Sequence, residues 1–215
     1  MPKKNKAACK LNKKEYLKAI ARETARMSYP GRTSGTLLRN NSNLHPEKAK
    51  HAIEEFFVSK FPIGKLWDRQ VKRSGYEKWH KQQVEALSGV IKKYEKKREN
   101  AYCAISAKLL NTFMHQLMKY KKFRYLYEEL HLPLDTQAFD SLVAKLKEIG
   151  KKPQMDKLRD LVNRYKKKAF TVNSNDYYET QKQLNCLKKY LNKVLKSEGV
   201  KLESRVDLNC TLWAK

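Results

Sequence analysis

Hydrophobic residues recur every three or four positions along most of this chain, which is the spacing of amphipathic helices. Proline and glycine stand mostly between the periodic segments, where helices begin or end. The pattern predicts helices at residues 12–27, 46–60, 76–97, 105–120, 135–149, 153–165 and 176–197. We therefore predict an all-α fold, a two-lobed helical domain with a cleft.

The last residues follow a different pattern. From Val200 to Leu212, apolar and small side chains alternate with charged or polar ones. A period of two is typical of a strand. Since there is no sheet for a single strand to join, we expect a short extended C-terminal segment that lies along the helices.

The chain is strongly basic. Its 215 residues include 48 Lys and Arg against 22 Asp and Glu, a formal net charge of +26. Such an excess opposes compact folding by self-repulsion and indicates a polyanionic partner. We expect DNA, with RNA as the alternative. Residues 1–14 are predicted to be a basic arm, 15–100 one helical lobe and 101–215 the other, with a single compact domain as the alternative division.

Other function classes are disfavoured by the sequence. No apolar run approaches the roughly 20 residues of a membrane span, and no signal-peptide apolar region follows the basic N-terminus. The cysteines are scattered without metal-ligand or disulfide-motif spacing: Cys9, Cys103, Cys186 and Cys210. We expect a cytoplasmic, nucleoid-associated protein with no membrane contact, metal or other cofactor.

A lysine and an aspartate are the candidate catalytic residues. Lys108 lies early in one apolar helical segment, and Asp135 opens the next. Cleavage of an N-glycosidic bond develops positive charge on the sugar, which a carboxylate stabilises, while an amine can attack the anomeric carbon and form a Schiff base. Because the base must first leave the duplex, we expect Lys108 and Asp135 to open into one positively rimmed cleft.

A family resemblance rests on these segments. SAKLLN, residues 106–111, followed by LPLDTQAFDSLVAKL, residues 132–146, resembles the catalytic region of the helix-hairpin-helix DNA glycosylases, which include endonuclease III. There, a G-x-K-x-A-N-like segment opens one helix and a V-D-T-H-V-F-R-like segment opens the next. The resemblance implies that Lys108 is the Schiff-base nucleophile of a lyase and that Asp135 is the catalytic carboxylate.

A wider pattern adds a base pocket. GYEKWHKQQV, AKLLN and LHLPLD are similar to a WH…QK-x-x-N…H-x-P-x-D arrangement in small bacterial proteins. By this similarity Trp79, His80 and His131 line the pocket. The implied activity is excision of a damaged or modified base, in repair or in defence against modified foreign DNA.

This protein must bind the DNA backbone in a different way from the members of that family. AYCAI replaces the Gly-rich hairpin before the lysine, and Lys108 and Asp135 are 27 positions apart (135 − 108), more than in the family. We expect basic side chains to bind phosphates instead, namely Arg32, Lys119, Lys121, Lys122 and Arg124. Residues 119–127, KYKKFRYLY, interleave cations with aromatics. Either these aromatics stack on bases, or they belong to the core beneath a solvated cationic rim.

Each candidate also has a plainer interpretation. Asp135 before Thr136 is typical of a helix N-cap, and Trp79 at helical spacing is typical of a core residue. His80 and His131 are compatible with ordinary hydrogen-bonded histidines. The alternative function is therefore a non-catalytic nucleic-acid-binding protein, either DNA-architectural or RNA-binding.

Overall fold

The all-α prediction is confirmed by a computed structural model. It describes residues 13–28, 46–93, 102–132, 174–194 and 201–210, together with 140, 142–144, 147, 156, 160, 196 and 199, and among these no residue is in a strand. The elements are α1 (Lys13–Ser28), α3 (Pro46–Glu55), the π-helix η1 (Phe56–Lys60), α4 (Ile63–Trp67), the 3-10 helix η2 (Arg73–Gly75), α5 (Tyr76–Lys92), α6 (Tyr102–Leu117), the 3-10 helix η3 (Lys121–Glu129), α9 (Ser174–Val194) and α10 (Asp207–Cys210). Asp135, Arg32 and the first twelve residues lie outside the described residues.

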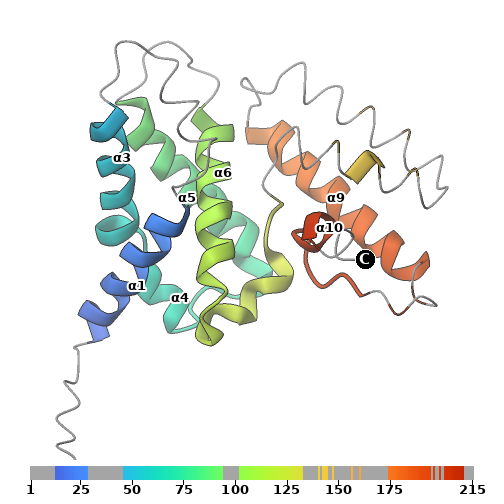
Figure 1. Ribbon diagram of the computed structural model, residues 1–215, viewed down its shortest axis with the longest axis horizontal. Helices are drawn as coiled ribbons and strands as arrows, with labels where there is room; N and C mark the ends of the chain where they lie inside the picture. The colour runs from blue at the N-terminus through green and yellow to red at the C-terminus, as the bar shows by residue number, and fades with distance from the viewer. Residues whose placement is uncertain are drawn as a thin grey trace, which may run out of the picture.

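Helices α1, α3, α4, α5 and α6 form one bundle (Figure 1). Helix α5 turns its apolar stripe inward, with Trp79, Val84 and Leu87 buried at helical spacing. Helix α6 packs against α1 and α5. Inside the bundle, the ring of Phe57 stacks on that of Phe113, with 4.1 Å between centroids. The predicted division into two lobes stays a prediction.

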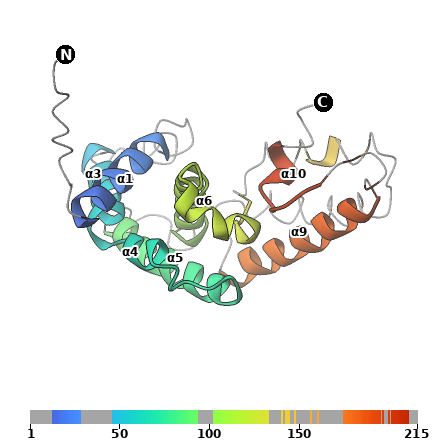
Figure 2. The same ribbon diagram turned by 90° about the horizontal axis from the view of Figure 1, so that it is seen from below.

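Helices α9 and α10 lie on the other side of α6 from α1 and α3, as both views show (Figures 1 and 2). Apolar residues of α9 and of the C-terminal segment join the same core as the bundle, among them Leu184, Leu191, Leu202, Val206 and Leu208. The long helix that the sequence predicts from residue 176 is thus observed, and it begins slightly earlier.

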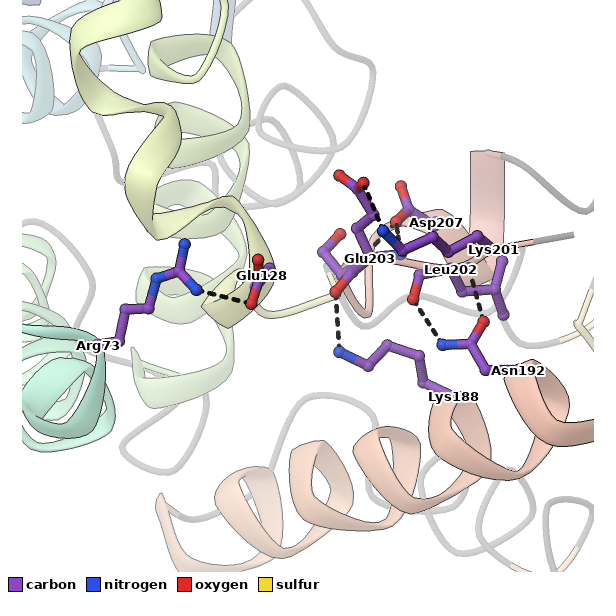
Figure 3. A network of polar contacts seen from close by, with 9 residues as sticks. Arg73, Glu128, Lys188, Asn192, Lys201, Leu202, Glu203 and Asp207 are labelled. Carbon is purple, nitrogen blue, oxygen red and sulfur yellow. Dashed lines mark hydrogen bonds and ion pairs between the residues drawn. The ribbon is translucent and has the colours of Figure 1, made fainter.

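The C-terminal segment is only partly as predicted. Residues 201–206 are not helical and lie along α9, where the Asn192 amide donates to the Leu202 carbonyl at 2.8 Å and accepts from its N–H at 2.7 Å (Figure 3). Asp207–Cys210 is helical, so the prediction of one extended run is wrong there. The carboxylate of Asp207 accepts the N–H groups of Glu203 and Ser204, both at 2.7 Å, and this turns the chain.

Candidate functional site

Lys108 lies half-buried on α6, between the buried residues Ala107 and Leu109. Asn111 follows it by three positions, so the two side chains lie on neighbouring positions of one helix face. The Asn111 amide is buried. Because Asp135 lies outside the described residues, its approach to Lys108 stays a prediction, as does phosphate binding by Arg32.

The structure brings the three predicted base-pocket residues together. The rings of His80, on α5, and His131, just after η3, are 4.1 Å apart between centroids. The ring of Tyr76 lies 5.7 Å from Trp79 and 5.8 Å from each histidine. The histidines are fully buried, and Trp79 is nearly so. These residues form a buried cluster, and their contact with a base stays a prediction.

A chain of hydrogen bonds joins the two histidines across three helices. The hydroxyl of Tyr178 lies 2.8 Å from His80 Nδ1, and His80 Nε2 lies 2.8 Å from Asn111 Oδ1. Asn111 Nδ2 donates to the hydroxyl oxygen of Tyr177 at 2.7 Å. That hydroxyl lies 3.1 Å from His131 Nδ1. We call Tyr178, His80, Asn111, Tyr177 and His131 the polar chain.

Gln181 determines where the protons of the polar chain can lie. The N–H of Leu132 can only donate, so Gln181 Oε1 is its acceptor at 3.1 Å. Gln181 Nε2 therefore donates, to the Leu132 carbonyl at 2.7 Å and to the Tyr177 hydroxyl at 3.3 Å. With Asn111 also donating to Tyr177, the Tyr177 proton goes to His131 Nδ1. In a neutral imidazole this leaves the remaining proton on His131 Nε2.

Both histidines are uncharged at neutral pH. Burial lowers the pKa of His80 to about 3, an effect that the hydrogen bond from His80 to the Asn111 oxygen opposes and the positive charge of Arg205 increases. Burial, His80 and Arg205 hold the pKa of His131 well below its usual value. The pair is therefore neutral, and its one ring nitrogen without a partner among the described residues, His131 Nε2, suits an uncharged polar group better than a phosphate.

Three polar atoms at this cluster are buried without a hydrogen-bond partner among the described residues. They are the Tyr76 hydroxyl, Trp79 Nε1 and His131 Nε2. An unsatisfied buried polar atom costs about 1–3 kcal/mol. A ligand that presents hydrogen-bonding groups to this cluster would recover part of that cost.

Arg205 is a buried cation next to the cluster. Its guanidinium donates to the carbonyls of Leu130 at 3.0 Å and Gln181 at 3.4 Å, and to that of Glu129. No carboxylate among the described residues forms an ion pair with it. Arg205 thus fixes the backbone that immediately precedes His131 and helps to keep that histidine neutral.

Several members of the site were missed by the sequence analysis. Asn111 belongs to the AKLLN segment that carries the resemblance, and Tyr76 stands at helical spacing from His80, so both had a signal. The side chains contributed by α9 and the C-terminal segment had none, because their partners are remote in sequence: Tyr177, Tyr178, Gln181 and Arg205.

The predicted phosphate-binding residues on η3 and just before it are all exposed: Lys119, Lys121, Lys122 and Arg124. Since a 3-10 helix has three residues per turn, its side chains form three rows. Phe123 and Leu126 form the buried row. The other positions leave the cations in solvent, where a phosphate backbone can reach them.

The aromatics interleaved with those cations belong to the core or pack against it. The hydroxyl of Tyr120 donates to Glu23 at 2.6 Å, that of Tyr125 to the Leu66 carbonyl at 3.1 Å, and that of Tyr127 to Asp207 at 2.6 Å. These contacts favour the second of the two interpretations, with aromatics in the core beneath a cationic rim.

No group of three or more His, Cys, Asp or Glu side chains within the described part of the chain could hold a metal ion. None of its helices is long and apolar enough to cross a membrane. No protein-family model, curated protein or solved structure matches the chain.

Proposed function

We propose that this protein is a DNA glycosylase of the helix-hairpin-helix superfamily that removes a damaged or modified base. The main support is the position of Lys108 on α6. It is three residues, about 4.5 Å of helix rise, from Asn111, whose amide is hydrogen-bonded to His80 and to Tyr177. The predicted nucleophile is thus about one helical turn from the amide that is hydrogen-bonded to His80.

In the proposed reaction, the extruded base leaves its sugar as Lys108 or a water molecule attacks. Attack by the neutral Lys108 amine forms a bond from Nζ to the anomeric carbon and breaks the N-glycosidic bond, so the base leaves with that electron pair and takes up the amine proton. The ring C–O bond of the sugar then opens, its oxygen takes up a proton, and the nitrogen forms the Schiff base. The Asp135 carboxylate stabilises the positive charge that develops on the sugar. Trp79 and His131 hold the base through Nε1 and Nε2, the ring nitrogens without a partner among the described residues, and His80 lines the pocket beside them.

The surface cations supply affinity for the phosphate backbone. Lys119, Lys121, Lys122 and Arg124 are exposed, and the net charge of +26 attracts DNA without regard to sequence. Such a protein would act in repair, or in defence against foreign DNA that carries modified bases.

Borohydride trapping on a panel of duplexes with modified bases tests the proposal. Wild-type protein should form a covalent adduct with one of these duplexes because borohydride reduces the Schiff base. Lys108→Gln should form none while binding the duplex as before. Lys81→Gln, which removes an exposed lysine of α5, is the matched control and should be trapped normally.

A glycosylase that uses water instead of Lys108 would not be trapped. In that case wild type should still release a free base, and Asp135→Asn should slow the release by about 10²–10⁴-fold. If wild type releases no base from any duplex, and both variants bind DNA normally, the proposed activity is wrong.

The second candidate is a non-catalytic nucleic-acid-binding protein. It is favoured by the exposed cations of η3, which serve phosphate binding without any chemistry. Tighter binding to structured RNA than to duplex DNA at equal salt would identify an RNA-binding protein, and the reverse preference a DNA-architectural one.

A further inference from the structure

An exposed aromatic pair lies where α1, α4 and η3 meet. Tyr16 on α1 is the large hydrophobic side chain that stands out as exposed in the described part of the chain, with 41% of its surface accessible. Its ring meets Trp67 of α4 edge-on, with 5.8 Å between centroids and an interplanar angle of 80°. Trp67 is half-buried and rests on Phe123. Lys122 places its ammonium 5.3 Å from the Trp67 ring centroid.

The elements that meet at the aromatic pair carry several exposed cations. They are Lys65 on α4, Arg69 in the turn after it, Lys119 just before η3, and Lys121, Lys122 and Arg124 on η3. Two acidic residues of these elements have basic partners, since Asp68 pairs with Lys13 at 2.7 Å and Glu128 with Arg73 at 2.8 Å. A third, Glu23 on α1, accepts from the hydroxyl of Tyr120 at 2.6 Å. The surface formed by Tyr16, Trp67 and Lys122 therefore combines an accessible aromatic ring with a nearby cation.

The turn beside this surface is held in an unusual conformation. Arg69 has φ of 55°, in the left-handed region that residues other than glycine rarely adopt. Its N–H donates to the Leu66 carbonyl at 3.1 Å, and its guanidinium lies 5.4 Å from the Tyr125 ring centroid. Backbone strain of this kind is often found at functional sites. Here it fixes a cation beside the row of η3 that contains Lys122.

We infer that this surface binds single-stranded nucleic acid. An unpaired base stacks on the exposed Tyr16 ring, while Lys122 and Arg69 contact the flanking phosphates. Stacking of this kind contributes affinity with little regard to base identity, because every base has a π-face. A duplex buries those faces between its own base pairs, so it gains only the phosphate contacts.

The inference does not depend on Lys108 or on base excision. It concerns a different set of residues on α1, α4 and η3, and it adds a binding site for unpaired nucleotides to either function considered above. Its failure would leave the trapping experiment unaffected, since Lys108→Gln removes none of the three side chains.

Binding of a labelled oligo(dT) of about 12 nucleotides, followed by fluorescence anisotropy, tests the inference. Tyr16→Ala should weaken binding by about 5- to 150-fold, the factor that corresponds to the loss of one stacked base. Tyr16→Phe keeps the ring and should bind like wild type. Tyr16→Phe keeps the edge contact with Trp67 and should unfold at the wild-type temperature, whereas Tyr16→Ala loses that contact and should still be folded at the assay temperature; a thermal melt verifies both.

The charge contribution is tested on the same oligonucleotide. Lys122→Gln should reduce the slope of log affinity against log salt concentration by about 0.7, as expected for one lost contact to single-stranded phosphate. Lys193→Gln, on the exposed side of α9, is the control and should leave the slope unchanged.

Duplex DNA and oligo(U) complete the design. Tyr16→Ala should leave affinity for a duplex of equal length unchanged, and an equal loss on oligo(U) would extend the site to RNA. The inference is overturned if Tyr16→Ala binds oligo(dT) as wild type does, if Tyr16→Phe loses as much as Tyr16→Ala, or if the loss is as large on duplex DNA.

Discussion

His80 and His131 show how burial changes the chemistry of a residue. In water an imidazole takes up a proton near pH 6.5, but inside this protein the cation would lose its hydration. Arg205 adds a positive charge nearby. The two residues therefore act as neutral hydrogen-bonding groups, and their charged form is strongly disfavoured in the folded chain.

We predict that the protein loses stability in mild acid. The pKa of His80 falls from 6.5 in the unfolded chain to about 3 in the folded protein, so between these pH values the unfolded state binds the extra proton. The stabilisation is complete above pH 6.5 and is lost as the pH falls toward 3. His80 alone should cost about 2 kcal/mol at pH 5, and His131 acts in the same direction. Urea unfolding at pH 7.5 and 5.0 measures the difference.

The matched variants separate this effect from general acid sensitivity. His80→Gln should reduce the difference in unfolding free energy between the two pH values. His51→Gln, at an exposed position of α3, should leave it unchanged. Equal unfolding free energies of the wild type at both pH values would show that His80 is not held neutral by the fold.

At the scale of elements, side chains of helix α9 hold two non-helical segments in place, one at Leu132 and one at Leu202. Gln181 forms a pair of hydrogen bonds with the backbone of Leu132, and Asn192 forms the same kind of pair with Leu202. A side-chain amide has one donor end and one acceptor end. It can therefore bond both the N–H and the carbonyl of one backbone residue, as a neighbouring strand in a sheet would. Lys188 adds a third contact, to the carbonyl of Glu203 at 2.9 Å (Figure 3).

Asn192→Ala should release the C-terminal segment from α9. It removes both hydrogen bonds to Leu202, for an expected loss of about 1–3 kcal/mol. The exposed Lys201 beside Leu202 should then be cut faster by trypsin, and the amide of Leu202 should exchange faster with deuterium. Lys193→Ala, which changes an exposed neighbour on α9, is the control. Unchanged exchange at Leu202 in Asn192→Ala would mean that other contacts hold the segment.

At the scale of the whole molecule, a continuous apolar core holds together a chain of net charge +26. The core residues come from every part of the described chain, from Leu17 to Leu208. The positive charges lie mostly outside and repel one another. Folding therefore depends on burial that outweighs this repulsion, and a polyanion relieves it.

We predict that salt stabilises this protein. Raising NaCl from about 20 to 300 mM shortens the Debye length and screens the repulsion. Each kcal/mol relieved should raise the unfolding temperature by about 2–4 °C for a chain of this size, so we expect a rise of a few degrees. Thermal melts followed by circular dichroism give the measurement. A lower melting temperature at high salt would show that attractive ion pairs dominate instead.

The sequence by itself determined the fold class and most helix positions. Helical periodicity is a local property, because residues three or four positions apart share a face wherever the helix packs. The segments that begin at Pro46, Tyr76 and Ser174 could therefore be predicted to within a few residues. The pattern around Trp79, His80 and His131 also singled out residues that the fold brings together.

Only the tertiary structure decided which side chains complete that cluster. His80 contacts Tyr178 across 98 positions, and Asn111 contacts Tyr177 across 66. No spacing rule connects residues so far apart. Arg205 is a further example. The alternating pattern of the C-terminal segment predicts that its side chain is in solvent, but the guanidinium is buried and donates hydrogen bonds to three backbone carbonyls. Those acceptors converge only after the helices have packed, so this part of the site follows from the folded chain and not from its pattern.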